Sequence, residues 1–414
     1  MKIKNSPLYF LIIILLGLGF AFRISSQSKT ILPKNQPVVF ITTLKKEPRI
    51  FENRQILEIG DSRVYTDLFP KYRVGDQLKV ETTFDTGGKT LSAKIEKIGY
   101  GETSVARLSG LRHKITQNIN QLLPTREATL IAGTVLGVDT IGRDFQDELI
   151  RTGTIHVVVV SGQNLMIVAG IFLALAGYIG RRQSLALATV VCFGYALLTG
   201  FEPPVVRATL MVLASSVAIF FGREVMPILS IVIAALLIIF VWPSAVGEIS
   251  FQLTFAATLG IMTLGRWFIG KFMQGSDPKG DRTLKKEFLD LLLSNAAVAT
   301  SAYLFTAPVI LFYFGRISPL APFANILVAE AVFPMMIFGF LVAITSLIFM
   351  PLAQVVAYLA YVPAFYFVKV VEVFAKLPAG QLSLGKGSEA MVVGWYGLLL
   401  GLMFVWGRRL NPKS

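Results

Sequence analysis

A cluster of polar residues interrupts the apolar segment over residues 154–175, which reads TGTIHVVVVSGQNLMIVAGIFL. The cluster comprises His156, Ser161, Gly162, Gln163 and Asn164. Unpaired polar groups are costly in hydrocarbon, so we expect these residues to face protein or water rather than lipid. They are therefore candidates for lining a buried aqueous pathway. The alternative is a cluster that only holds helices together, which is a common use of Ser, Asn and Gln in membranes.

Ser161 and His156 are the only pair in this segment that could act as nucleophile and base. They are five residues apart, and no third group that would orient the base is evident. The chain has two histidines and one cysteine, and no His, Asp and Glu residues are spaced as metal ligands are. A G-x-x-x-x-G-K-[ST] loop for nucleotide phosphates is also missing from the sequence. We therefore expect no catalytic residue, no metal and no cofactor, and a protein that is not an enzyme.

Arg207 is the most notable charge near a predicted membrane helix. It follows Pro203-Pro204, which favours a position near the start of a helix that enters from the outer face. One interpretation is that Arg207 supplies positive charge at the outer mouth of a pathway for anions. The other is that it snorkels to the surface or pairs with Glu202.

Two further polar residues are candidates for the same pathway. Gln252 lies one helical turn after Glu248, and we expect Gln252 to face the protein interior. Asn325 and Glu330 interrupt the apolar segment after Pro322, so several helices could converge on one polar lumen. Hydrogen bonding between helices is again the alternative.

The composition places the chain among integral membrane proteins. Hydrophobic residues make up 54% of the sequence, and the mean hydropathy is +0.65. The net charge of +14 does not establish a nucleic-acid partner, because membrane proteins collect Lys and Arg in cytoplasmic loops. Cys192 is the only cysteine, so an intramolecular disulfide is excluded.

The first 24 residues are predicted to form a membrane anchor. Lys2 and Lys4 precede an apolar segment over residues 8–22, which fits either a signal peptide or an anchoring helix. No clear small-x-small cleavage site follows this segment. We therefore expect an uncleaved anchor that begins in the cytoplasm.

Residues 25–102 are predicted to form a small extracytoplasmic β domain. Apolar and polar residues alternate in QLKVETTF and again in TLSAKIE, with a turn at Gly87-Gly88 between them. The short strands and glycine turns favour a five-stranded barrel of the OB type, a fold that can bind single-stranded nucleic acid. Four aromatic residues are nevertheless more typical of a core than of a stacking surface, namely Phe40, Phe51, Tyr65 and Tyr72.

Residues 103–153 are predicted to form three helices. The first carries an apolar stripe flanked by Arg107 and Arg112, so it lies either in the membrane interface or against the β domain. The second is too short to span a bilayer, and Gly153 is expected to end the third.

Residues 154–414 are predicted to form a polytopic membrane domain, which gives about ten spans with the amino-terminal anchor. The nine expected here are 155–179, 184–200, 204–221, 226–242, 249–270, 288–314, 319–349, 351–375 and 390–407. The four valines before Ser161 and Gly162 oppose a continuous helix, so we expect the first to be broken. Pro334 is expected to kink the 319–349 span or divide it. If the β domain is outside, the loops rich in Lys and Arg lie inside, as the positive-inside rule requires.

Four segments of this chain, in order, resemble the competence domain of the ComEC family. They read RTGTIHVVVVSGQNLMIVAG, LTGFEPPVVRATLM, FQLTFAATLGI and FGRISPLAPFANILVAE, within residues 105–350. The resemblance implies an inner-membrane channel that admits single-stranded DNA in natural transformation, with an OB-like external domain. It places functional positions at His156, Ser161 and Gly162, at Gly200 and Arg207, at Phe251 and Gln252, and at Asn325.

The chain departs from the family pattern in three places. Gly162-Gln163-Asn164 stands where the family usually has Gly-Leu-His, and Glu330 stands where a proline is common. Asparagine keeps hydrogen bonding but does not titrate near neutral pH, which favours a structural or pore-lining role over proton chemistry. The carboxy-terminal metallo-β-lactamase-like domain of many relatives is also missing, so strand degradation is expected from another protein.

The sequence therefore predicts a multi-pass protein of the cell membrane that passes single-stranded DNA inward. Its expected partners are DNA, membrane lipid, a DNA receptor, a cytoplasmic ATPase and a nuclease. Two other classes stay open, a secondary transporter of a small anion and a non-conducting structural or assembly protein.

Overall fold

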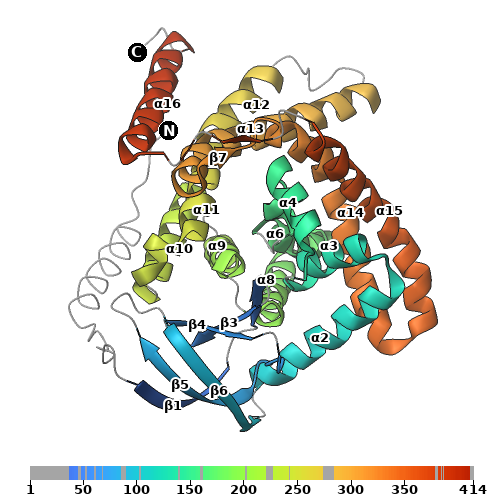
Figure 1. Cartoon of the computed structure of the whole chain (residues 1–414). Helices are drawn as coiled ribbons and strands as arrows, with labels where there is room; N and C mark the ends of the chain where they lie inside the picture. The colour runs from blue at the N-terminus through green and yellow to red at the C-terminus, as the bar shows by residue number, and fades with distance from the viewer. Residues whose placement is uncertain are drawn as a thin grey trace.

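The computed structural model describes residues 37–410 apart from short internal gaps. These are residues 45–47, 52–53, 60–61, 68, 85–89, 102–103, 139, 159–161, 201–202, 221–226, 242, 274–283, 378–380, 384 and 386. A small β region is followed by a larger helical part (Figure 1). The predicted anchor over residues 1–24 lies outside the described residues.

The β region consists of two antiparallel sheets of three strands each. One sheet has the order β1-β5-β6, with β1 at Pro37–Thr43, β5 at Asp76–Phe84 and β6 at Thr90–Tyr100. The other has the order β2-β3-β4, with β2 at Arg49–Phe51, β3 at Arg54–Ile59 and β4 at Ser62–Asp67. The strands predicted from QLKVETTF and TLSAKIE are confirmed as β5 and β6, which pair with each other. β4 also lies beside β6, which brings the two sheets together.

Alternate residues of these strands build a small hydrophobic core. Leu78 and Val80 of β5 are fully buried against Leu57 and Val64 from the other sheet. Tyr72 belongs to this core, and burial together with the Asp76 carboxylate raises the pKa of its phenol. Phe40 packs partly against the same core, whereas Tyr65 is 41% exposed. The core role expected of these aromatic residues is therefore confirmed for Tyr72 and not for Tyr65, while the side chain of Phe51 lies outside the described residues.

Three helices follow the β region, α2 at Ser104–Leu122, α3 at Thr125–Leu136 and α4 at Arg143–Thr152. The apolar stripe of α2 was predicted to meet lipid or the β domain. Its buried residues Ile115 and Ile119 instead join a core with α3 and two later helices. α3 is apolar around most of its circumference and lies inside this core, which explains why its shortness does not prevent it from being stable. Gly153 ends α4 in the left-handed conformation, as predicted.

Each of the nine predicted spans contains one or more helices among its described residues. The helices are α5 (Ile155–Val158), α6 (Gly162–Leu173), α7 (Ala176–Ile179), α8 (Arg181–Leu198), α9 (Pro203–Phe220), α10 (Pro227–Val241), α11 (Ile249–Gly260), α12 (Arg266–Met273), α13 (Leu284–Phe314), α14 (Ala321–Ile348), α15 (Met350–Ala375) and α16 (Glu389–Leu410). A 3₁₀ turn η1 (Pro243–Gly247) precedes α11, and a π-helical turn η2 (Ile261–Gly265) joins α11 to α12. The short strands β7 (Arg316–Ile317) and β8 (Leu382–Ser383) pair with each other.

Four helical stretches in the described part of the chain are long and apolar enough to cross a membrane. They are Ile249–Gly270, Leu292–Phe314, Ala321–Ile348 and Met350–Ala375. Shorter apolar helices cover Asn164–Ile179, Ile231–Phe240 and Glu389–Leu399. The chain is thus a mostly helical protein with membrane-length helices, and the total of about ten spans stays a prediction.

α14 and α15 form a long hairpin whose two helices lie side by side at one edge of the molecule (Figure 1). Buried alanines of α15 make this close approach possible, at positions 353, 357, 360 and 364. Pro334 lies within α14, yet α14 continues from Ala321 to Ile348. The predicted division into two half-helices is therefore wrong, because packing against α3 and α15 stabilises the helix on both sides of the proline.

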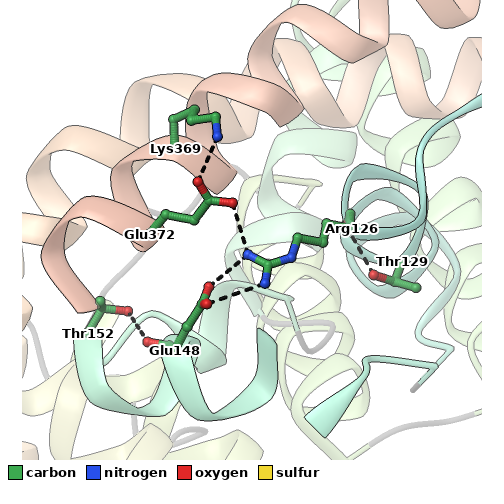
Figure 2. A network of polar contacts seen from close by, with 6 residues as sticks. All are labelled: Arg126, Thr129, Glu148, Thr152, Lys369 and Glu372. Atoms are coloured by element: carbon green, nitrogen blue, oxygen red, sulfur yellow. Dashed lines mark hydrogen bonds and ion pairs between the residues drawn. The ribbon is translucent and has the colours of Figure 1, made fainter. Parts of the chain in front are cut away.

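An ion-pair network joins α3, α4 and α15 (Figure 2). Arg126 Nη1 lies 2.9 Å from Glu148 Oε2 of α4 and 2.9 Å from Glu372 Oε1 of α15. Lys369 pairs with the other oxygen of Glu372 at 2.7 Å. The Arg126 guanidinium also lies over the ring of Phe145, 5.3 Å from its centroid. This network fixes the end of α4, where Gly153 leads into the polar segment.

Candidate functional site

Two helices, α5 and α6, occupy the segment where the sequence predicted an interrupted span. α5 ends at Val158 and α6 begins at Gly162, and residues 159–161, with Ser161, lie outside the described residues. His156 is on an exposed side of α5. The predicted break in the helix falls on residues 159–161 and stays a prediction there. The described residues on its two sides belong to α5 and α6.

Close backbone packing positions the two ends of this segment. Gly153 has φ +70°, and a Cβ there would lie 2.5 Å from the Cβ of Ala321. Thr152 and Thr154 on either side of it share a hydrogen bond of 2.8 Å. At the far end, a Cβ on Gly162 would lie 3.3 Å from the Cβ of Ala208 in α9. The polar segment is thus held between α14 and α9.

Asn164 is 1% exposed and lies in the packed interior. Its Nδ2 donates to the carbonyl oxygen of Thr134 in α3 at 3.0 Å, and the Tyr195 hydroxyl of α8 donates to the same oxygen at 3.1 Å. Two donors from different helices therefore converge on one carbonyl near the end of α3. This geometry favours the helix-packing alternative for Asn164. Gln163 lies in α6, and its side chain is outside the described residues.

Arg207 is 2% exposed and bonds to α11. Its Nη2 donates to the Ser250 carbonyl at 3.0 Å, to the Ser250 hydroxyl at 3.3 Å and to the Thr254 hydroxyl. The buried Nε atom has no hydrogen-bond partner among the described residues. The guanidinium does not snorkel to the surface, because burial is nearly complete. The other alternative, pairing with Glu202, stays open because residues 201–202 lie outside the described part.

The partners of Arg207 are all neutral within the described chain. Ser250 and Thr254 are four residues apart, so their side chains lie on the same face of α11. Glu248, just before α11, is exposed and lies too far from Arg207 for an ion pair, although its carboxylate attracts the guanidinium at longer range. A buried cation without a paired carboxylate is electrostatically unfavourable, and an anion would compensate it.

The other two predicted residues lie apart from these contacts. Gln252 is on a different face of α11 from Ser250, and its Nε2 donates to the Val246 carbonyl at 3.1 Å. Asn325 lies in α14, where its buried Oδ1 has no partner among the described residues. One turn further on, the Asn295 amide of α13 donates to the carboxylate of Glu330. The structure therefore packs α6 and α11 against α9, the helix that carries Arg207, and leaves Asn325 apart from them on α14.

Sequence reasoning missed a second buried arginine. Arg112 of α2 is 8% exposed, and its Nη2 donates to the carbonyl of Gly137, the C-cap of α3, at 3.2 Å. Its Nη1 also comes close to Gly200 after α8, where a Cβ would approach within 3.1 Å. Guanidinium groups are favourable at helix carboxyl ends because carbonyls are unpaired there. The role of Arg112 could not be seen in the sequence, because an arginine beside an apolar stripe looks like an ordinary surface charge. The partners of Arg207 had a detectable signal, because Ser250 and Thr254 are four residues apart and so present two hydroxyls on one helix face.

Metal-ligating residues do not gather in the described part of the chain, where no three His, Cys, Asp or Glu side chains could hold one ion. The expectation of no metal and no catalytic residue stays a prediction.

The helical part of the chain matches a known protein family. The family model described as Competence protein matches residues 135–409, which include the polar segment, Arg207, α11 and the hairpin of α14 and α15. No curated protein and no solved structure gives a significant match. Because the family match covers well over half of the chain, this protein belongs to the Competence protein family.

Proposed function

We propose that this protein is a channel of the cytoplasmic membrane through which single-stranded DNA enters during natural transformation. Membership of the Competence family supports a role in DNA uptake. The observation that carries the channel assignment is the buried guanidinium of Arg207, whose Nε is unpartnered and whose described partners are neutral. Each phosphate of a DNA strand carries a negative charge, so a pathway across the membrane needs donors and positive potential.

The surroundings of Arg207 support an anionic substrate. α9 begins at Pro203, so Arg207 lies in its second turn, near the amino-terminal end where the helix dipole favours anions. The Ser250 hydroxyl is within reach of the same guanidinium and can donate to a phosphate oxygen, whereas the Thr254 hydroxyl donates to the Ser250 carbonyl. A guanidinium matches two phosphate oxygens with parallel N–H groups, which a single ammonium does not.

The β region supports the same proposal if it is an OB-type barrel. When β1 and β2 are taken as one bent first strand, the pairs β2-β3, β3-β4, β5-β6 and β1-β5 follow the OB order. The contact between β4 and β6 would close that barrel. We propose that this domain lies outside the cytoplasmic membrane and receives the strand before it enters the helical part.

The proposed channel is not an enzyme and has no motor of its own. Separate partners would then bind the duplex, degrade the second strand and pull the first inward. A secondary transporter of a small anion would use the same buried cation. The two functions differ in their substrate, because a transporter saturates with one small solute and DNA uptake depends little on the sequence supplied.

The test is deletion of the gene in its natural host, followed by tracking of fluorescently labelled DNA. We expect DNA to stop outside the cytoplasmic membrane and to enter again when the wild-type gene is restored. Normal arrival of DNA in the cytoplasm of the deletion strain would refute the channel. Loss of uptake of one small anion in that strain, with normal DNA entry, would identify the transporter instead.

A further inference from the structure

Pro308 creates an unusual backbone group in the middle of α13. Proline has no N–H, so the carbonyl four residues earlier, that of Leu304, loses its donor within the helix. The indole Nε1 of Trp395 in α16 donates to this carbonyl at 3.0 Å. A side chain from the carboxy-terminal helix thus replaces the hydrogen bond that Pro308 removes.

The same segment bonds to α13 at further points. The hydroxyl of Tyr396 donates to the Phe305 carbonyl at 2.6 Å, and the two rings lie 6.0 Å apart between centroids. Nearer the end of α13, the backbone N–H of Gly387 donates to the Leu311 carbonyl at 3.2 Å. β8 pairs with β7 beyond that point. Residues 387–396 therefore run back along α13 from its end past the proline.

The same α13 segment also packs closely on α11. A Cβ on Gly260 would lie 2.5 Å from the Ser301 carbonyl oxygen and 2.9 Å from the Cβ of Phe305. The π-helical turn η2 begins at the next residue, and such turns relax the regular bonding of a helix. α11 is also the helix that holds Arg207, through Ser250 and Thr254. Phe305 is therefore enclosed between α16 and the helix that carries the Arg207 contacts.

We propose that α16 is a strap that fixes the angle of α13 at Pro308, with Trp395 and Tyr396 as its two attachment points. Docking satisfies the Leu304 carbonyl, which would be costly to leave unpaired in a membrane, and adds a second bond at the Phe305 carbonyl. Release of the strap frees the angle at Pro308 and loosens the contact of α13 with Gly260.

The form of α16 fits a strap rather than a core helix. Its outward residues Val393 and Leu398 are 72% and 63% exposed, and Trp395 is 40% exposed. In Figure 1 α16 stands at the edge of the molecule, on the far side from α14 and α15. Specific hydrogen bonds, rather than deep burial, therefore hold it to α13, so the docked and released forms can differ by a small free energy.

The first test is a double-mutant cycle between Pro308→Ala and Trp395→Phe. Cys192 is fully buried and is the only cysteine, so a thiol-reactive dye reports thermal unfolding of the purified protein. We expect Trp395→Phe to lower the unfolding temperature in the natural background. The loss should be much smaller in the Pro308→Ala background, because the backbone N–H of the new alanine can donate to the Leu304 carbonyl. An equal loss in both backgrounds would overturn the proposal.

The second test measures the angle itself. Spin labels at Leu289 and Phe314, both exposed, flank Pro308 in a Cys192→Ser background and are about 37 Å apart along a straight helix. We expect one narrow distance with the strap docked and a broader distribution in the Trp395→Phe/Tyr396→Phe variant. Tyr358→Phe, an exposed tyrosine of α15, is the matched control and should leave the distance unchanged. An unaltered distribution in the double variant would refute the strap, whatever the protein transports.

Discussion

Arg126 Nη1 donates to Glu372 Oε1 at 2.9 Å, although 246 residues separate them in the chain. The same nitrogen lies 2.9 Å from Glu148, so one guanidinium neutralises a carboxylate on each of two helices. Its side chain is 36% exposed, and those of Glu148 and Glu372 are 26% and 22% exposed. Solvent therefore screens the network in part, but four charges share it and the Phe145 ring covers one face of the Arg126 guanidinium.

Arg126→Gln is expected to lower the stability of the folded protein by about 1 kcal/mol, because Glu148 then loses its cation and Glu372 keeps only Lys369. The unfolding temperature in detergent, reported by labelling of Cys192, is the measurement. Arg143→Gln, at the exposed start of α4, is the control and should change little. The effect should shrink as salt is raised. A loss that is as large for Arg143→Gln as for Arg126→Gln would contradict the network.

Gly153→Ala is expected to destabilise the junction between α4 and α5. The left-handed φ of +70° disfavours any side chain, and the new Cβ would lie 2.5 Å from the Cβ of Ala321. The cost should be about 2 kcal/mol or more. Gly142, at the other end of α4, has φ −64° and open space, so Gly142→Ala is the control. The unfolding temperatures of both variants are the measurement. Equal losses for Gly153→Ala and Gly142→Ala would contradict a special requirement for glycine at position 153.

The helices could be predicted from the sequence because apolar runs of sufficient length need no long-range information. All nine expected segments contain helices among their described residues, and the alternation in QLKVETTF located β5. The environment of α2 could not be predicted, since an amphipathic stripe fits lipid, the β domain or other helices equally well. In the structure α2 packs on α3 and α14, and the contact with α14 joins segments that are far apart in the chain.

The candidate site could be predicted only in part for the same reason. Arg207 was identifiable as a charge beside an apolar helix, but its bonds to Ser250 and Thr254 join residues about 45 positions apart. Asn164 was grouped with the pathway because it follows Gly162 and Gln163. Its burial against Thr134 depends on where α3 lies, which no local pattern encodes.

The proposed topology predicts opposite labelling of two exposed basic positions. Lys94 of β6 is expected outside the membrane, and Arg181 at the start of α8 inside, because the positive-inside rule places Lys and Arg on the cytoplasmic side. Single cysteines at these positions in a Cys192→Ser background should react differently with a membrane-impermeant thiol reagent. In intact cells without an outer-membrane barrier, only position 94 should react. Equal reaction of both would overturn the orientation.

The purified protein is expected to show no nuclease activity with Mg²⁺, Mn²⁺ or Zn²⁺. Metal-dependent cleavage requires several ligands around one ion, and no such group occurs among the described residues. Release of nucleotides from labelled single-stranded DNA is the measurement. Cleavage that co-purifies with the wild type and disappears in a His156→Ala/Glu248→Gln variant would contradict the proposal.

The positive charge of Arg207 is expected to attract the phosphates of an entering DNA strand and so to be required for uptake. Arg207→Gln removes the buried charge, so DNA uptake per folded molecule should fall strongly. Arg207→Lys should restore part of it, because lysine keeps the charge but loses the planar fork that grips two phosphate oxygens. Uptake of labelled DNA, divided by the amount of folded protein in the membrane, is the measurement.

Thr254→Val separates this role from simple helix packing. The variant removes a hydroxyl that accepts from Arg207 Nη2 and leaves the charge in place. If Arg207 serves only to join α9 to α11, Thr254→Val and Arg207→Gln should both lower the amount of folded protein and leave uptake per molecule unchanged. If the charge acts on the strand, Arg207→Gln alone should reduce uptake per molecule by a large factor, because the donors that remain are neutral. Wild-type uptake by a normally folded Arg207→Gln protein would remove Arg207 from the pathway.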